Sequence, residues 1–187
     1  MSDPLSNRKI ILQTDRLILR LAKLSDAADY FAFCKDPSTS RYSEWMPHES
    51  IAQTKAYLRC LRRNPSDDSL DFAIVRKDLQ RVIGSCGFTR LNLSLKTGEI
   101  GYCLAADARG CGYGFEAIRA LCAYGFGQLH LNRIEARVVC ENTPSIALLE
   151  RLGFSPEGRM KKGAFIKGKT CDLFLYAQTD DEFAKQR

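Results

Sequence analysis

The chain has 187 residues, a mass of 21.0 kDa, 45% hydrophobic residues and a formal net charge of +6. This length favours one domain over residues 1–187, and the apolar runs fall far short of the roughly 18 to 20 residues that span a bilayer. The start, MSDPLSNRK, lacks the basic and apolar segments of a secretory signal, so we expect no membrane association.

The eight cysteines could suggest disulfides or a metal site, but no two of them have the CxxC spacing. Most lie within apolar periodic segments, where a free thiol is an ordinary core residue. Because unpaired thiols are typical of a reducing compartment, we expect a cytoplasmic protein. The two histidines, His48 and His130, are not clustered with other ligands, so we expect no metal cofactor.

The positive charge would suit nucleic acid, a phosphate-rich ligand or a solvated surface. The basic residues are scattered along the chain, with only short clusters at Lys161, Lys162, Lys167 and Lys169. We therefore expect no direct nucleic-acid binding.

Residues 12–21 alternate apolar and polar side chains, which predicts a first strand. A helix follows, capped by Ser25 or Asp26, and stops before Pro37. A capping-box pair then opens a second helix over residues 50–63.

The pattern changes to period two at residue 71. It predicts successive antiparallel strands over residues 71–77, 81–91 and 97–105, joined by short connections. An amphipathic helix over residues 112–129 and a strand over residues 134–140 follow.

Another helix begins at Asn142 or Thr143 and ends at Gly153, a residue suited to a left-handed stop. Residues 157–178 close the chain as a pair of strands that turn near Lys167 and Gly168. We predict an α/β (α+β) fold with a mixed, mostly antiparallel sheet, a central β-α-β unit and helices on both faces.

The turn DARGCGYGFEA places glycines at positions 110, 112 and 114, where the third long helix begins. The first N–H groups of a helix have no intrahelical partners, and the helix dipole adds partial positive charge, so this turn suits an anion such as a diphosphate. Arg109 could add a charge-assisted contact. The GKS or GKT of a P-loop is missing, GYGFEA with Glu135 fits a dinucleotide fingerprint poorly, and a plain tight turn stays an alternative.

The pattern RxxGxG from Arg109 to Gly114, followed by NxxSxxLLERLGF, resembles the acyl-CoA-binding core of the GCN5-related N-acetyltransferases, the GNAT family. TDRLILR, GEIGY, and LGFSPEGR with the later Gly168 and Asp172 are similar to the RimJ/RimL-like branch of ribosomal-protein N-terminal acetyltransferases. Together these stretches span nearly the whole chain, in the family's order.

The resemblance implies that acetyl-CoA is the cosubstrate. Its pyrophosphate would lie on the backbone amides of the turn, and its pantetheine arm between parallel strands that splay near Leu104 and Cys140. Asn142 would contact that arm, with a pure helix cap as the alternative role. The implied cofactor-binding residues are Cys103, Leu104, Arg109, Gly110, Cys111, Gly112, Tyr113, Gly114 and Asn142.

Glu99 is our candidate general base, acting directly or through water, because strand alternation places it on one face with Gly101 and Cys103. A solvent-facing carboxylate is the alternative. A backbone N–H near residues 102–104 would stabilise the oxyanion. A cysteine nucleophile, Cys103 or Cys111, is conceivable, but no histidine lies nearby in sequence and we prefer direct transfer.

The family's usual tyrosine acid is missing, because Leu149 stands at that position. A thiolate with a pKa of about 8.5 leaves tolerably without assistance, and Ser145 or a water could protonate it. Ser145 could equally serve only as a residue of the first helical turn.

We expect an acetyl-CoA-dependent N-acetyltransferase that acts on the α-amine of a protein or peptide. A small-molecule amine is the alternative acceptor, and a non-catalytic acyl-CoA-binding module is the alternative class. The acceptor region would include Arg41, Tyr42, Glu44 and Trp45, unless Trp45 plugs the core. Because dimers are common in the family that the sequence resembles, a homodimer is a further possibility.

Overall fold

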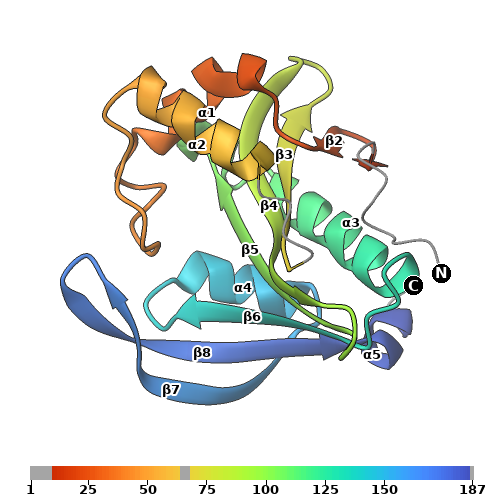
Figure 1. Ribbon diagram of the computed structural model, residues 1–187. Helices are drawn as coiled ribbons and strands as arrows, with labels where there is room; N and C mark the ends of the chain where they lie inside the picture. The colour runs from red at the N-terminus through yellow and green to blue at the C-terminus, as the bar shows by residue number, and fades with distance from the viewer. Residues whose placement is uncertain (1–9, 64–67, 186–187) are drawn as a thin grey trace.

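An eight-stranded mixed sheet forms the centre of the computed structural model, which describes residues 10–63 and 68–185 (Figure 1). The strands are β1 (Ile11–Gln13), β2 (Leu17–Arg20), β3 (Leu70–Arg76), β4 (Arg81–Asn92), β5 (Thr97–Leu104), β6 (Arg133–Val139), β7 (Ser155–Ile166) and β8 (Lys169–Thr179). Their order is β1-β2-β3-β4-β5-β6-β8-β7, and all neighbours are antiparallel except β5 and β6.

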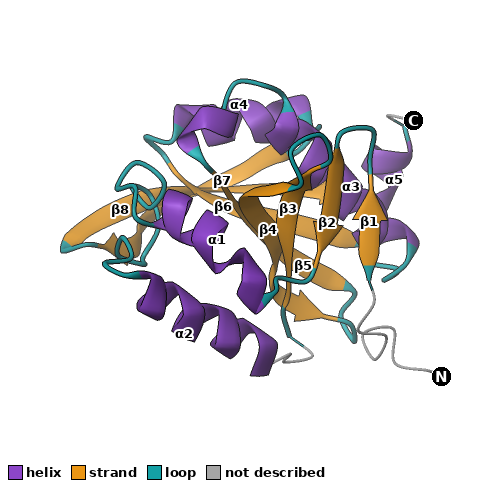
Figure 2. Ribbon diagram, turned by 90° about the horizontal axis from the view of Figure 1, so that it is seen from above, coloured by secondary structure: helices purple, strands orange, loops and turns teal. Residues whose placement is uncertain are grey.

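Helices cover both faces of this sheet (Figure 2). They are α1 (Ala27–Cys34), α2 (Ile51–Arg63), α3 (Tyr113–Gly127), α4 (Thr143–Arg151) and α5 (Asp180–Ala184), with single 3-10 turns at Leu24–Asp26 and Ala106–Ala108. The pair α1 and α2 lies on one face, and α3 and α4 lie on the other. The predicted fold class is confirmed. Within the described residues, no helix is both long and apolar enough to cross a bilayer.

The prediction of one strand over residues 12–21 is wrong, because the chain turns back between β1 and β2. Thr14 N donates to Leu17 O at 3.0 Å, and Leu17 N donates to Thr14 Oγ1 at 2.9 Å. The polar run from Gln13 to Arg16 interrupts the alternating pattern, so the sequence contained a signal for this turn.

The short helix α5 was not predicted, although its signal is present in the sequence. Thr179 accepts a hydrogen bond from Glu182 N, and the Glu182 carboxylate accepts from Thr179 N at 2.8 Å, which completes a capping box. The spacing T-x-x-E could have revealed this helix.

The core between the sheet and α3 fixes where α3 begins. Ile118, Leu121 and Cys122 are buried on its inner face, as predicted. Near its end, Gly125 passes so close to the sheet that a Cβ there would stand 2.8 Å from Phe88 Cζ and 3.0 Å from Ile134 Cδ1. This close approach holds the helix against β4 and β6.

We predict that Gly125→Ala destabilises the protein by about 1 to 3 kcal/mol, although alanine is the better helix former. The added methyl group must displace two buried side chains. Gly127→Ala is the matched control, since no atom lies within 4 Å of its Cβ position, and it should stabilise by up to about 1 kcal/mol. Urea unfolding measures both, and equal effects of the two variants would contradict the packing argument.

Candidate active site

The sheet splits between β5 and β6. These parallel strands pair at Thr97 with Arg133, Gly98 with Ile134 and Glu99 with Glu135. Beyond that point β5 follows β4 as far as Leu104, while β6 follows β8 as far as Val139. The predicted splaying of the two strands is confirmed, and it begins directly after Glu99.

The two faces of β5 at the split look toward different helices. Phe72 of β3 packs edge-on against Tyr124 of α3 at 6.2 Å, so its neighbour Asp71 faces the side of α1 and α2. Cross-strand pairing puts Gly101 on the same side as Asp71, and alternation adds Glu99 and Cys103. The predicted grouping of Glu99, Gly101 and Cys103 on one face is therefore correct.

The glycine turn has the backbone that its sequence predicted. Gly110 and Gly112 have φ of +75° and +80°, which lie in the left-handed region that glycine adopts most readily. Gly112 is the N-cap of α3. Within the described part of the chain, the amides of residues 110–115 donate none of the observed hydrogen bonds, so several N–H groups are available at this helix start.

The turn meets the end of β5 and the first part of α4. A Cβ at Gly114 would stand 3.3 Å from Leu148 Cδ2 and 3.4 Å from Leu104 Cδ1. A side chain at this position would fill the space between them. The predicted residues of β5, the turn and α4 thus come together at the open end of the split.

Arg109 does not point its guanidinium into the turn, contrary to the contact we expected. Its Nε and Nη2 donate to Leu104 O at 3.1 and 3.0 Å. Its Nη1 donates to Ser38 Oγ at 3.1 Å, and its Nη2 to Thr39 Oγ1 at 3.0 Å. The long side chain reaches the unpaired end of β5 and ties it to the loop between α1 and α2.

Arg16 supplies charge at the turn instead, and we did not predict it. It donates to Cys111 O at 3.1 Å and pairs with Glu116 of α3 at 2.6 Å. Its guanidinium lies 4.5 Å from the centre of the Tyr113 ring, and that of Arg76 lies 5.1 Å from the same ring. Arg16 belongs to the TDRLILR segment, so the resemblance contained a signal for it.

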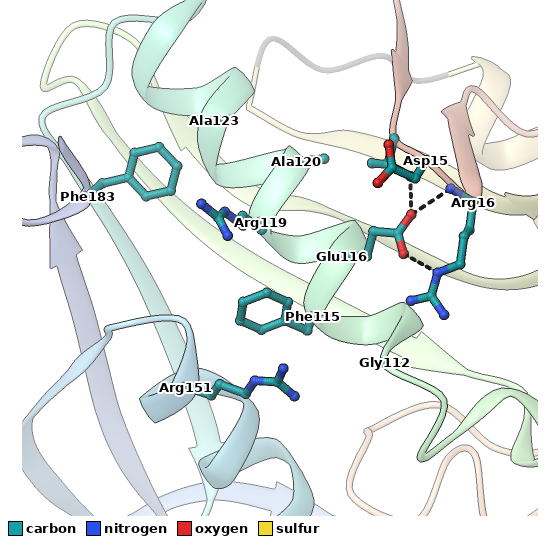
Figure 3. Close-up of a pocket in the computed structure, with 11 residues that line it drawn as sticks. Asp15, Arg16, Gly112, Phe115, Glu116, Arg119, Ala120, Ala123, Arg151 and Phe183 are labelled. Atoms are coloured by element: carbon teal, nitrogen blue, oxygen red, sulfur yellow. Dashed lines mark hydrogen bonds and ion pairs between the residues drawn. The ribbon is translucent and has the colours of Figure 1, made fainter. Parts of the chain in front are cut away.

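A cavity of about 480 Å³ lies beside α3 (Figure 3). Figure 3 shows Phe115, Arg119 and Arg151 on one side of α3, with Arg16 and Glu116 on the other. The Arg151 guanidinium stacks 4.4 Å from the centre of the Phe115 ring, and that of Arg119 lies 6.0 Å away. Arginines on both sides of the helix start make this region suited to phosphate groups.

Asn142 precedes α4 as its N-cap residue, but its side chain makes no capping hydrogen bond. The helix start uses the backbone instead, since Ile146 N donates to Asn142 O at 3.1 Å. The Asn142 side chain is therefore free for another partner, and the pure helix-cap role is not supported.

Tyr102 of β5 joins Ser145 of α4 by a hydrogen bond between their hydroxyl groups, 2.6 Å long. This bridge spans the opening on the side of α3 and α4. Burial raises the pKa of Tyr102 to about 12, so the phenol stays protonated. Leu149 is fully buried and presents no polar group to the split.

Glu99 lies between two arginines. Its Oε2 is 3.5 Å from Arg137 Nε and 3.8 Å from Arg90 Nη1, and 18% of its side chain is exposed. These residues line a second cavity of about 480 Å³ together with Asp68 and Glu135. The carboxylate is thus neither isolated nor simply solvent-facing.

The two cysteines near the split differ in environment. Cys103 Sγ lies 3.4 Å from Ser85 Oγ, and burial raises the pKa of its thiol, which disfavours the nucleophilic thiolate. Cys111 is exposed, and its Sγ lies 3.5 Å from Arg109 O. Neither cysteine lies in a setting that would create an activated thiolate with a histidine.

Hydrogen bonds hold the loop between α1 and α2 at three places. Besides Arg109, Lys167 donates to Ser40 Oγ at 2.7 Å, and Tyr42 OH donates to Glu141 O at 3.2 Å. Arg41 and Glu44 are exposed. Trp45 is half-buried against the core, so it serves as a partial plug rather than an open aromatic surface.

Asp71 is a carboxylate that sequence reasoning missed. It lies on β3 and faces α1 and α2, and its carboxylate has no hydrogen-bond or ion-pair partner among the described side chains of residues 10–61 and 68–185. Burial raises its pKa to about 6. A lone aspartate at the start of a strand gives no sequence signal that separates it from a surface residue.

No group of three or more potential metal ligands occurs among the residues with described positions. Main-chain donors, arginines, hydroxyls and carboxylates surround the split in the sheet. Such a set suits an anionic ligand on one face and an amine on the other.

Known proteins are similar to this chain in sequence. The profile of a family described as an acetyltransferase (GNAT) domain matches residues 16–155. The uncharacterised N-acetyltransferase p20 of Bacillus licheniformis is 36% identical over 92% of this chain and 98% of its own. A ribosomal protein uS5 alanine N-acetyltransferase of Escherichia coli is 30% identical over 96% of this chain and 95% of its own.

A solved structure has the same fold. The microcin C7 self-immunity acetyltransferase MccE, solved in complex with acetyl-CoA and AMP, matches with a TM-score of 0.79 and 22% identity. The match covers 89% of this chain and 93% of MccE.

We predict that Asp71→Asn stabilises the protein at pH 8 but not near pH 4. A carboxyl whose pKa rises from 3.8 to about 6 on folding holds its proton more tightly when folded, so its charge costs up to about 3 kcal/mol above pH 6. Near pH 4 the folded carboxyl is protonated and the unfolded one is close to half protonated, so the cost falls below about 1 kcal/mol. Urea unfolding at the two pH values measures this, and an equal difference at both would contradict it.

Proposed function

The chain belongs to the GNAT family and is an acetyl-CoA-dependent N-acetyltransferase, and from this premise we propose that its acceptor is the α-amine of a protein or peptide. The split of β5 from β6 beside a turn of free amides is the observation that supports acetyl-CoA binding at this site. The name of the Escherichia coli relative supports a protein acceptor. An α-amine also demands little of a base, since its deprotonation at pH 7 costs roughly 1 kcal/mol, against roughly 4.6 kcal/mol for lysine.

The pyrophosphate of acetyl-CoA would accept hydrogen bonds from the amides of residues 110–115. Arg16 supports this because it already contacts the turn at Cys111 O. Arg119 and Arg151 would bind the remaining phosphate charge beside α3. Arg109 would act as a positioning residue that fixes the end of β5, and no metal takes part in this scheme.

The pantetheine arm would enter the split beside Leu104, Gly114 and Asn142. Gly114 supports this path because it leaves space between Leu104 and Leu148. The unpaired edge of β5 near Cys103 offers a main-chain N–H for the thioester carbonyl oxygen.

Transfer would proceed by direct attack. The amine nitrogen forms a bond to the thioester carbon, the C–S bond breaks, and the ammonium group loses two protons in total. Glu99, at the start of the split, would take one of these protons directly or through water and release it to solvent. Ser145 or a water would protonate the departing sulfur, and the second proton from nitrogen would replace that proton through water. Tyr102 would hold the Ser145 hydroxyl toward the opening.

The alternative acceptor is a small amine, and the alternative class is an acyl-CoA-binding module without turnover. The free thiols support a cytoplasmic location.

We predict that Asn142→Ala raises the Kd for coenzyme A about three- to tenfold while leaving the midpoint of unfolding unchanged. The loss corresponds to one hydrogen bond of roughly 0.5 to 1.5 kcal/mol. Loss of a helix cap would instead destabilise the protein by about 1 kcal/mol. Calorimetry and thermal unfolding separate the two, and unaltered affinity with lowered stability would remove Asn142 from the binding site.

The function itself is tested by thiol release from acetyl-CoA with a panel of peptides and small amines. We expect turnover with peptide α-amines, and about a hundredfold lower kcat for Glu99→Gln with an unchanged Kd for coenzyme A. Glu157→Gln, which removes a surface carboxylate paired with Arg133, is the matched control and should behave as wild type. Coenzyme A binding without turnover of any amine would favour the acyl-CoA-binding module. If Glu99→Gln has the same rates as wild type from pH 6 to 9, Glu99 is excluded as the base.

A further inference from the structure

Asp71 and two glycines form a row across the acceptor face of the sheet. Asp71 of β3 pairs with Gly87 of β4, and Gly87 pairs with Gly101 of β5. Because paired residues share a face, all three lie on the side of α1 and α2. The row therefore leads from a carboxylate to the strand that borders the split.

The Asp71 carboxylate extends over β4, in the direction of the split. A Cβ at Gly87 would stand 3.0 Å from Asp71 Oδ1, so this oxygen occupies space that a side chain on β4 would fill. At Gly101, a Cβ would meet Thr89 Cγ2 at 2.8 Å, with no other described atom within 4 Å. Gly87 lets the backbone of β3 come close to β4, because a Cβ there would also meet the Leu70 carbonyl oxygen, and Gly101 leaves room for the Thr89 methyl group.

The Asp71 carboxylate has no positively charged side chain beside it, whereas the Glu99 carboxylate has two. Glu99 lies near Arg90 and Arg137. The ionisable groups around Asp71 are Tyr30 of α1, Tyr57 of α2, Cys86 and Cys103, whose pKa values burial raises, so they stay neutral. No cationic side chain among the described residues balances Asp71, so a cationic ligand would gain a charge-assisted hydrogen bond there.

We propose that Asp71 binds a second positively charged group of the acceptor, beside the nitrogen that is acetylated. The inference rests on the proposed transferase activity and narrows its acceptor class. The reacting nitrogen must reach the gap after Glu99, whereas the Asp71 carboxylate lies over β4, about one strand spacing or 5 Å short of β5. A group held by Asp71 is therefore a different one, and the preferred acceptors are amines with another cation a few bonds away.

Paired amines test the proposal. We compare butylamine with 1,4-diaminobutane, and propylamine with 1,3-diaminopropane, by thiol release from acetyl-CoA. Wild type should prefer the diamine by about tenfold in kcat/KM, beyond the factor of two that its second amine supplies. Asp71→Asn should raise the KM of the diamines about tenfold and leave the kinetics of the monoamines unchanged.

The matched control is Asp181→Asn, which removes one exposed carboxylate from α5, outside both cavities. It should keep the diamine preference, which separates a local contact from a change in net charge. Equal preference in wild type and Asp71→Asn would overturn the proposal. An equal loss of kcat for monoamines and diamines would also overturn it, because Asp71 would then act on the reacting nitrogen.

A binding measurement separates this inference from the proposed function. Calorimetry with 1,4-diaminobutane, in the presence of coenzyme A, should detect binding to wild type and about tenfold weaker binding to Asp71→Asn. If no amine is acetylated while this difference persists, the transferase proposal fails and the docking role of Asp71 stands. If monoamines are acetylated and the difference is missing, the docking role fails alone.

Discussion

The early end of the pairing between β5 and β6 is the constraint on which the site depends. Beyond Glu99 and Glu135 the facing edges of these strands have no ladder partners, and main-chain groups left without partners are costly when buried. Antiparallel pairing to β4 and β8 holds the two edges apart. Arg109 donates hydrogen bonds to Leu104 O at the open end. Because this carbonyl has a partner, the gap is a stable part of the fold and not a frayed strand end.

Positive and negative side chains lie on opposite faces of the sheet at this gap. Arg16, Arg119 and Arg151 surround the start of α3, where free amides also point outward. Glu99 and Asp71 lie on the opposite face, toward α1 and α2. An anion and an amine would therefore approach from opposite sides and meet between the strands, which gives part of the net charge of +6 a local role.

The sequence predicted the β-α-β unit and the glycine turn because each depends on local pattern. It failed where long side chains choose among distant partners. Nothing near Arg109 in the sequence indicates that its guanidinium would donate to Ser38 and Thr39, which lie 71 and 70 residues away. The lack of partners for Asp71 depends equally on segments far apart in the chain, so no spacing rule could predict it.

Leu149 and Tyr102 together explain how a site of this kind could do without a tyrosine on α4. Leu149 is fully buried, so a hydroxyl at that position would need a different orientation of α4 to reach the split. Tyr102 brings a hydroxyl to the first turn of α4 from the opposite strand. With a pKa of about 12 it suits hydrogen bonding better than proton donation, and a thiolate with a pKa of about 8.5 requires no stronger acid. In the proposed reaction, Tyr102 therefore orients Ser145, and the proton on sulfur can come from solvent.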